Sequence, residues 1–290
     1  MKRGAISLLV ASGAFLARTV PYAFLFLVSR CLGAIWYWLI PVRNTVACDN
    51  IAHALKLSPA ASKKLTRRMY NHLCLSVLEL FRYGTQRGLK LPYVVEGEEH
   101  LRKLMDSGQG AFLLTAHLGN WEVLARYGEE LPGPVRIVRK KLSISFWHEL
   151  WLELRAGGPK QISTDKTAVG LTRFVRKGGM VGMVLDQHAT EASAIRLPFF
   201  GRKASTSTGM VRLARMLQAP IVPIFSYRRS GLHMIKIGKP FLIERTMSRS
   251  CDVANGVRVC LRHIETAIEE SPEQWLWIHR RWKPDPKVPS

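Results

Sequence analysis

The sequence is short of acidic residues for its length. Its 290 residues include 21 aspartates and glutamates against 43 lysines and arginines, so the formal net charge is +22. A surplus of this size predicts an anionic partner or surface. The chain carries no RNA- or DNA-reading motif, and its basic residues are spread out rather than stacked with aromatic residues in one segment. We therefore expect no nucleic acid partner.

Cysteine is also scarce, and its placement excludes a disulfide framework. The five cysteines are odd in number, scattered, and without C-x-x-C spacing: Cys31, Cys48, Cys74, Cys251 and Cys260. This pattern is typical of reduced thiols in a protein that faces the cytosol. Histidine and acid occur together at Asp186-Gln187-His188, but no ligand set with zinc spacing accompanies them. We predict no metal ion.

No apolar run reaches the roughly 20 residues that cross a bilayer unbroken. The first 42 residues hold three shorter stretches, 4–17, 19–29 and 31–42, separated by Arg18 and Arg30. A cleaved signal peptide or a buried hairpin of soluble helices would fit part of this pattern. Apolarity, however, continues far beyond a normal signal-peptide core, with no clear small-x-small cleavage site. We predict an uncleaved segment that spans or lies in the bilayer, with Trp36, Tyr37 and Trp38 at the interface.

The remainder, residues 43–290, contains no repeat, low-complexity tract or linker, and 47% hydrophobic content in the whole chain allows one large core. We therefore divide the chain into a membrane-associated segment, 1–42, and a single domain, 43–290. Periodicity predicts an α/β domain with a mixed sheet flanked by helices. The expected strands are 93–96, 110–115, 135–138, 161–163, 180–185 and an antiparallel pair, 221–227 and 232–237. The expected helices include 50–57, 59–83, 145–155 and 252–270.

The most informative segment is 116–122, Ala-His-Leu-Gly-Asn-Trp-Glu, which lies between an apolar strand and a helix. Reactive groups gather at such strand ends in α/β sheets. Glu122 could fix the tautomer of His117, which would then deprotonate a hydroxyl. Gly119 would allow a tight turn and close approach of substrate. Alternatively, His117 is a structural residue, and Glu122 complements the helix dipole behind an Asn120 N-cap.

The box His117-Leu-Gly-Asn-Trp-Glu122 resembles that of the bacterial lipid A biosynthesis acyltransferases, the lauroyl and myristoyl late acyltransferases within the glycerolipid acyltransferase superfamily. The superfamily's commoner form ends in Asp, whereas Glu after Gly-Asn-Trp is typical of this branch. The resemblance runs from about Arg43 to Lys283. It includes the segments 184–188, 197–201, 208–223 and 272–283. We interpret the tryptophans of the last segment, Trp275, Trp277 and Trp282, as packing residues.

The resemblance implies further site residues. Arg155 and Asp186 match an Arg and an Asp that the family uses in its active site, and Arg139 has a counterpart in the same segment. At a strand's carboxyl end, Asp186 would share a crevice with His117, while Arg155 could hold a phosphate or stabilise an oxyanion. The Lys140-Lys141 run beside Arg139 departs from the family pattern and favours a basic rim. With Gly119 and Asn120, these residues form the expected substrate-binding set.

The implied activity is transfer of a fatty acyl chain from an acyl thioester to a hydroxyl of a lipid A precursor. His117, aided by Glu122, would act as general base, and no cofactor is needed beyond the thioester co-substrate. The expected donor is acyl carrier protein, whose acidic surface suits the basic chain, with acyl-CoA as the alternative. We expect the protein to be located at the inner membrane, with its catalytic domain facing the cytoplasm. Competing hypotheses are acylation of another glycolipid or lysophospholipid, and a non-catalytic, membrane-docked basic scaffold that binds anionic lipid or nucleic acid.

Overall fold

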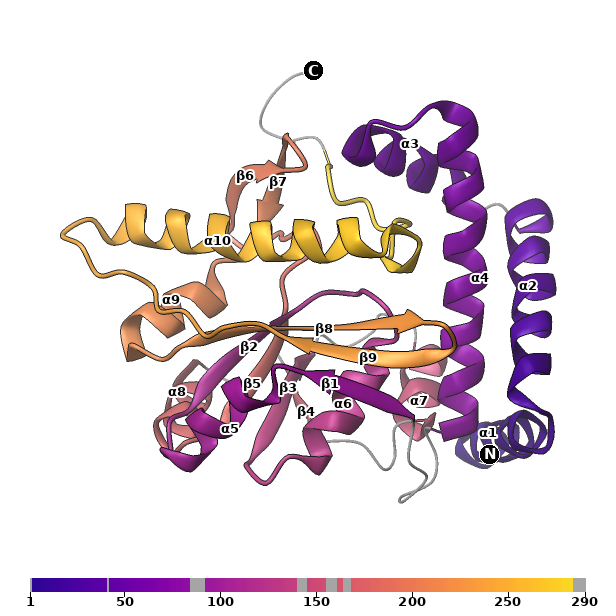
Figure 1. The fold of residues 1–290 in the computed structure, drawn as a ribbon, viewed down its shortest axis with the longest axis horizontal. Coiled ribbons are helices and arrows are strands. Elements are labelled where there is room, and N and C mark those ends of the chain that lie inside the picture. Colours follow the sequence, from indigo (N-terminus) through magenta and orange to yellow (C-terminus); the bar gives the residue numbers. More distant parts are fainter. Residues whose placement is uncertain are drawn as a thin grey trace.

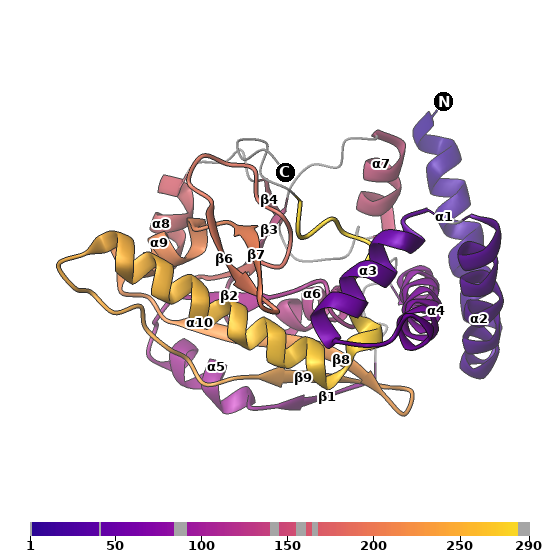
Figure 2. The ribbon, with the colours of Figure 1, turned by 90° about the horizontal axis from the view of Figure 1, so that it is seen from above.

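The computed structural model describes residues 2–40, 42–83, 92–139, 145–154, 161–163 and 168–283. It begins with four helices, α1 (Lys2–Thr19), α2 (Tyr22–Leu39), α3 (Asn44–Leu55) and α4 (Pro59–Tyr83). α2 lies along α4 at one end of the molecule, and α1 also contacts α4 (Figures 1 and 2). Ser58 Oγ accepts the backbone N–H of Ala61 at 3.3 Å, so the Ser-Pro pair begins α4 as its sequence predicts.

The first 40 residues form two helices, not three separate stretches. Arg30 lies inside α2 and does not interrupt it, because arginine is a good helix former. The break falls instead at Pro21, just before α2. Small residues let α2 approach α4: a Cβ on Gly33 would lie 2.8 Å from the Asn71 backbone. These helices are therefore packed on the domain that follows them.

The rest of the chain alternates strands and helices before it ends in a long helix. The elements are β1 (Tyr93–Glu96), α5 (Glu98–Asp106), β2 (Ala111–Thr115), α6 (Trp121–Glu130), β3 (Val135–Arg139), α7 (Ser145–Leu154), β4 (Gln161–Ser163), α8 (Ala168–Arg176), β5 (Met180–Val184), β6 (Ile195–Phe199), β7 (Arg202–Thr206), α9 (Gly209–Leu217), β8 (Ile221–Arg229), β9 (Leu232–Ile237), α10 (Arg249–Glu270) and a 3₁₀ turn, η1 (Pro272–Gln274).

Seven of these strands form one sheet in the order β1-β9-β8-β2-β5-β3-β4. β8, β2, β5, β3 and β4 run parallel, and β9 turns back against β8. β1 then pairs with β9 in parallel. The predicted mixed α/β sheet and its antiparallel pair are both confirmed.

Alternate residues of β2 separate the two faces of the sheet. Phe112 and Leu114 pack into the core formed with α8, α9 and α10, whereas Ala111 and Leu113 pack against α5 and α6. Figure 1 shows α10 on one side of the sheet and α5 and α6 on the other. Both faces are covered, which explains why β2 is uniformly apolar rather than alternating.

A two-stranded hairpin, β6 and β7, lies outside the main sheet and was not expected from the sequence. Pro198 within β6 weakens the strand pattern, since proline cannot donate to a ladder. The turn is made by Phe200 and Gly201, both with positive φ, at 50° and 77°. This geometry matches the two-residue turns that favour hairpins.

Candidate active site

The parallel pairing of β2 with β5 places His117 beside Asp186. Thr115 pairs with Val184 in the register of the two strands, and each candidate residue lies two positions beyond. Asp186 Oδ1 lies 2.9 Å from His117 Nδ1, and Asp186 Oδ2 accepts the His117 backbone N–H at 2.8 Å. The two side chains therefore meet at the carboxyl ends of β2 and β5.

Asp186 is buried, yet its surroundings favour the charged form. Burial alone would raise its pKa, but His117 and the indole N–H of Trp275 outweigh burial and hold the pKa at about 2. The Trp275 Nε1 donates to Oδ2 at 2.8 Å. Three donors thus hold one ionised carboxylate in a fixed orientation.

The imidazole of His117 is oriented by this carboxylate. Because Nδ1 faces Asp186, a neutral ring keeps its proton on Nδ1 and leaves Nε2 to accept one. The His117 side chain is 19% exposed, so the ring is reachable from solvent. Gln187 Nε2 lies 3.4 Å from Nε2 of the ring, and Trp121 packs edge-on with ring centroids 5.3 Å apart. This arrangement suits a general base.

The orienting contact at Nδ1 differs from the one expected. The sequence suggested Glu122, one helical turn from His117, whereas the structure places Asp186 there, 69 residues later in the chain. Strand register brings Asp186 to His117, and local sequence spacing does not show that register. Glu122 is buried in the first turn of α6, where its backbone N–H donates to Asn120 Oδ1 at 3.2 Å. The N-cap alternative is confirmed for Asn120.

Gly119 and Asn120 both make contacts within the protein, and their contact with substrate stays a prediction. Gly119 has φ of +61°, and a Cβ there would lie 2.1 Å from the Ser226 backbone oxygen, so glycine is needed where the loop crosses β8. Both polar atoms of the Asn120 amide are engaged: Oδ1 caps α6, and Nδ2 donates to Glu79 at 2.8 Å.

The side chains of the two arginines in the expected set, Arg139 and Arg155, lie outside the described part of the structure. Arg155 lies outside the described residues. Arg139 ends β3, where its backbone pairs with Ser163 of β4, but its side chain is outside the described part.

A segment after α10 completes the site, and its role was missed. Leu276 N–H donates to the His117 carbonyl at 3.1 Å, and Gly119 N–H donates to the Gln274 carbonyl at 3.0 Å. Trp275, between them, reaches Asp186. The buried tryptophans do pack together, as expected, with Trp275 and Trp277 ring centroids 4.5 Å apart. The additional role of Trp275 would have required knowing that this segment lies against the His117 loop.

An apolar cavity opens beneath α6 on the same face of the sheet as Thr115. Aliphatic and aromatic side chains form its walls, including Trp121, Leu124, Leu131, Val135, Ile137 and Ile224, and Gly182 of β5 contributes to its floor. Trp121, which contacts His117, also borders the cavity. An apolar chain lying in this cavity would therefore end close to the imidazole.

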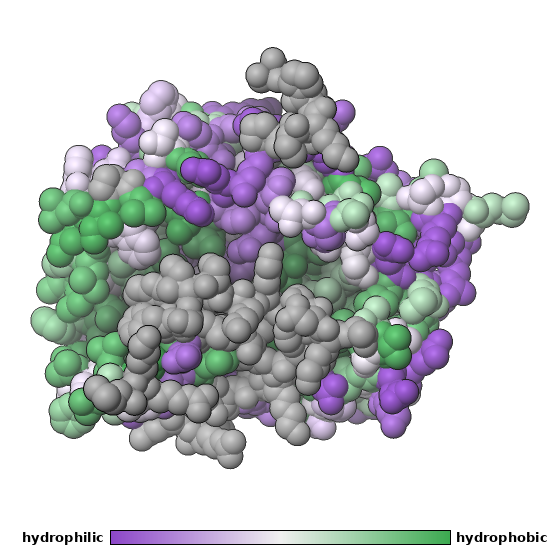
Figure 3. All heavy atoms as spheres, turned by 180° about the vertical axis from the view of Figure 1, so that it is seen from behind, coloured by the Kyte–Doolittle hydropathy of each residue, from purple (hydrophilic) through white to green (hydrophobic). Residues whose placement is uncertain are grey.

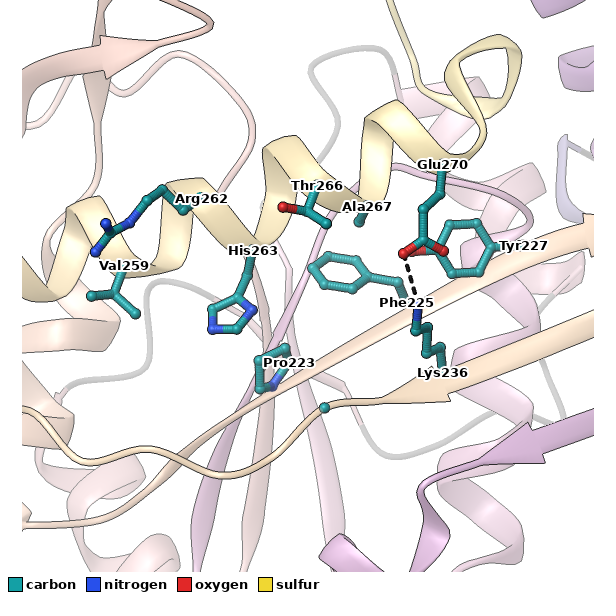
Figure 4. A pocket seen from close by; sticks show the side chains of 11 residues that line it. Pro223, Phe225, Tyr227, Lys236, Val259, Arg262, His263, Thr266, Ala267 and Glu270 are labelled. Atoms are coloured by element: carbon teal, nitrogen blue, oxygen red, sulfur yellow. Dashed lines mark hydrogen bonds and ion pairs between the residues drawn. The ribbon is translucent and has the colours of Figure 1, made fainter.

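A second hollow of about 480 Å³ lies between α10 and the β8–β9 pair. Figure 4 shows His263 reaching from α10 toward Pro223, and Lys236 Nζ donates to Glu270 Oε1 at 2.7 Å. None of the site residues above lines it. Among the described residues, no group of three or more histidines, cysteines and acids is placed to hold a metal ion.

Comparison with known proteins places this arrangement in a family. The fold and site define an α/β protein with a histidine–carboxylate pair at a sheet edge, beside an apolar helical layer. The chain belongs to the bacterial lipid A biosynthesis acyltransferase family, whose model matches residues 1–284. The resemblance seen in the sequence is confirmed.

Individual relatives are more distant. The lipid A biosynthesis lauroyltransferase of Escherichia coli K12 is 29% identical over 204 residues, which cover 68% of this chain and 64% of the relative. The match thus spans just under two thirds of that protein. The palmitoleoyltransferase of the same strain is 20% identical, covering 92% and 87%. The solved 1-acyl-sn-glycerophosphate acyltransferase PlsC of Thermotoga maritima is 13% identical, with a TM-score of 0.39, covering 87% and 97%.

Proposed function

We propose that this protein transfers a fatty acyl chain from an acyl thioester to a hydroxyl of a lipid A precursor. The observation that carries the proposal is the His117–Asp186 pair, held at 2.9 Å with the imidazole partly open to solvent. Family membership supplies the class of reaction. The pair supplies a base that could perform it.

In the proposed reaction, His117 Nε2 accepts the proton of the acceptor hydroxyl as its oxygen attacks the thioester carbonyl carbon. A tetrahedral oxyanion forms and then collapses, breaking the carbon–sulfur bond. The departing thiolate takes the proton from His117, so the enzyme returns to its starting state. Asp186 stabilises the transient imidazolium. Backbone N–H groups or Arg155 would stabilise the oxyanion.

The box offers neither Ser nor Cys next to His117, so the mechanism needs no covalent acyl-enzyme. We propose that Glu122 supports the site indirectly, as a buried carboxylate at the positive end of the α6 dipole. Arg139 and Arg155 would bind anionic groups of the substrates. The proposed reaction requires no cofactor.

We propose that the cavity beneath α6, whose volume is about 60 Å³, receives a short part of the acyl chain. Its lining is almost wholly apolar, and Trp121 connects it to His117. A chain lying there would present its thioester carbonyl near the imidazole. The depth of this cavity would then select chain length, because each buried methylene contributes about 0.8 kcal/mol.

The charge balance supports acyl carrier protein as donor. Acyl carrier proteins are acidic, and a chain with net charge +22 would attract such a partner and the phosphates of a lipid A precursor. Acyl-CoA is also anionic and is the competing donor. A direct comparison of turnover with the two donors separates them.

The outer faces of α1 and α2 support membrane attachment. The large side chains Phe15, Leu16, Phe24 and Leu39 are exposed, whereas the buried face of α2 consists of Leu25, Ser29 and Gly33. Figure 3 shows apolar residues gathered at the edge of the molecule formed by these helices. Among the described residues, α2 is the one helix long and apolar enough to cross a membrane. We propose that this edge lies in the inner membrane, with the site facing the cytoplasm.

The deciding experiment is mass spectrometry of lipid A from cells that lack this chain and cells that re-express it. We expect re-expression to add the mass of one acyl chain, and His117→Ala to abolish that addition at equal protein levels. An unchanged lipid A profile with a changed phospholipid or other glycolipid would refute the acceptor. Normal acylation by the His117→Ala variant would refute the enzymatic mechanism and favour a scaffold.

A further inference from the structure

A second buried carboxylate, Glu79 of α4, lies among donors from four other elements. It is 1% exposed. It accepts hydrogen bonds from Asn120 Nδ2 at 2.8 Å, from Arg228 Nε at 3.2 Å and from Tyr22 Oη, and it pairs with His233 Nε2 at 3.2 Å. The Arg228 guanidinium makes a second contact through Nη2. No residue of this cluster was singled out from the sequence except Asn120.

The residues around Glu79 favour its ionised form. Burial would raise its pKa, but His233 and Arg228 together lower it well below the usual range. The same guanidinium lies 2.6 Å from Nδ1 of His72, which also belongs to α4. A buried arginine and a buried carboxylate thus neutralise each other, and removing either leaves the other without a counter-charge.

The cluster contacts the His117 loop directly at Asn120 and indirectly through η1. Asn120 is the third residue after His117 and the N-cap of α6, so its position fixes where the loop ends. One residue earlier, Gly119 donates its backbone N–H to the backbone oxygen of Gln274. The Gln274 side chain exchanges two hydrogen bonds with the Arg228 backbone, at 2.7 and 2.8 Å. Glu79 and its partner Arg228 are therefore linked to the loop at two successive residues.

We propose that Glu79 is a positioning residue, which holds the His117 loop in its working geometry through Asn120. The inference rests on the proposed acyl transfer, since it assigns Glu79 a part in that reaction. Glu79 does not touch the reacting atoms. It acts from the helical layer, by fixing the Asn120 amide against which the loop turns into α6.

The test uses the full-length protein in vesicles containing a lipid A precursor, with acyl carrier protein thioester as donor. Glu79→Gln removes the charge and keeps the shape. Asn120→Ser removes the Nδ2 donor yet retains a residue that caps helices well, so it breaks the contact with little risk to the fold. Asp252→Asn is the matched control, because Asp252 is a buried carboxylate bonded to Arg215 at 2.7 Å, at the far end of α10 from η1.

We expect Glu79→Gln and Asn120→Ser each to lower kcat about 10-fold or more, with little change in KM, since a small misplacement of the base affects the chemical step. The double variant should be no worse than the poorer single variant, because both remove one contact. Hydrogen exchange of the 117–123 backbone should quicken in both variants and stay unchanged in Asp252→Asn.

Two results would overturn the proposal: unchanged exchange across 117–123 in both variants, or multiplicative loss of kcat in the double variant. If Glu79→Gln fails to fold, Asn120→Ser alone decides: unchanged exchange across 117–123 in that variant overturns the proposal. If the wild-type protein acylates no lipid A precursor, the proposed function fails separately, and the exchange measurement still decides whether Glu79 holds the loop.

Discussion

Among the described residues, two histidines pair with a buried carboxylate, and one of these pairs has the form of a reactive centre. His117 and Asp186 meet at 2.9 Å, and His233 and Glu79 meet at 3.2 Å. Both carboxylates are buried. The His117 side chain is 19% exposed, whereas that of His233 is 2% exposed. Glu79 additionally contacts an arginine, while Asp186 contacts an indole.

The comparison teaches that pairing alone does not make a general base. His233 is enclosed, so no hydroxyl can reach it, and its carboxylate is neutralised by Arg228. Among the described hydrogen bonds, the donor to Asp186 besides His117 is the neutral indole of Trp275, so no arginine is hydrogen-bonded to this carboxylate. Access for substrate and the absence of a directly bonded arginine among the described contacts distinguish the pair at the carboxyl ends of β2 and β5 from the pair between α4 and β9.

The largest expected effect separates the two histidines. His117→Ala should reduce kcat by roughly 10²–10⁴-fold, the usual contribution of a general base, and leave the melting temperature nearly unchanged. His233→Ala should do more harm to stability, by about 1–3 kcal/mol, because Glu79 loses a buried donor. Its effect on kcat should be smaller. Steady-state kinetics and thermal unfolding of both variants check this contrast, which a larger kcat loss in His233→Ala would reverse.

Asp186→Asn tests whether His117 and Asp186 act as a unit. The amide can no longer stabilise an imidazolium, so kcat should fall by roughly 10²–10⁴-fold. Added to His117→Ala, the change should cost little more, because the base is already gone. Glu122→Gln should lose less activity than His117→Ala. If the losses of kcat from His117→Ala and Asp186→Asn multiply in the double variant, the two residues act independently and not as a unit.

A smaller effect is expected at the floor of the cavity beneath α6. A Cβ on Gly182 would lie 3.6 Å from the Ile137 side chain, which is ordinary contact, so Gly182→Ala should fold and fill part of the cavity. We expect preference to shift toward shorter acyl chains by about 10-fold, the discrimination that one or two methylenes provide. Competition between thioesters of different length measures it. An unaltered chain profile would remove this cavity from the acyl path.

The enclosed cluster should make stability depend on pH. Burial, with Arg228, lowers the pKa of His72 to about 3, below the ordinary 6.5 of an unfolded chain. Between these values the unfolded state binds more protons, so stability is lost as pH falls from about 6.5 toward 3, by up to about 1.4 kcal/mol per pH unit. Denaturant unfolding at pH 7 and pH 5 should show the slope. His72→Gln should reduce it, whereas Gln in place of the exposed His53 should not.

The smallest effect expected is that of salt on membrane attachment. Insertion of an apolar edge is not screened by ions. A wash with 1 M salt, in which the screening length is roughly threefold shorter than at 0.1 M, should therefore leave the protein in the membrane fraction. Fractionation and immunoblotting measure this. Release by salt alone would mean that the basic surface, not α1 and α2, carries the attachment.

Local patterns in the sequence predicted most of the fold. The strand before His117, the helix 59–83 and the antiparallel pair at 221–237 follow from apolar periodicity and from Ser-Pro and Gly-containing breaks, which act over a few residues. The β6–β7 hairpin was missed because Pro198 obscures its strand pattern. The sequence pattern predicted a break at Arg30, but α2 continues through this residue because arginine has a high helix propensity.

The candidate site was less predictable, since its contacts depend on register and on distant segments. Strand order, which periodicity does not reveal, brings Asp186 to the Nδ1 of His117. Glu79 and Trp275 carry no local signal at all: one is a single acid within an amphipathic helix, and the other is one of several tryptophans in an apolar segment. The sequence predicted that Asp186 lies near His117, at the end of a strand, but it assigned the contact with the imidazole to Glu122.

The segment after α10 gives the site an order of assembly. Asp186 follows His117 by 69 residues, and Trp275 follows Asp186 by another 89. During synthesis, the imidazole and its carboxylate therefore emerge long before the indole and the backbone groups that hold them. A nascent chain that has not yet exposed Trp275 lacks one of the three donors to Asp186, and lacks both backbone bonds to the His117 loop. Completion of the site thus coincides with near-completion of the domain, so that a partly made chain is not yet a working one.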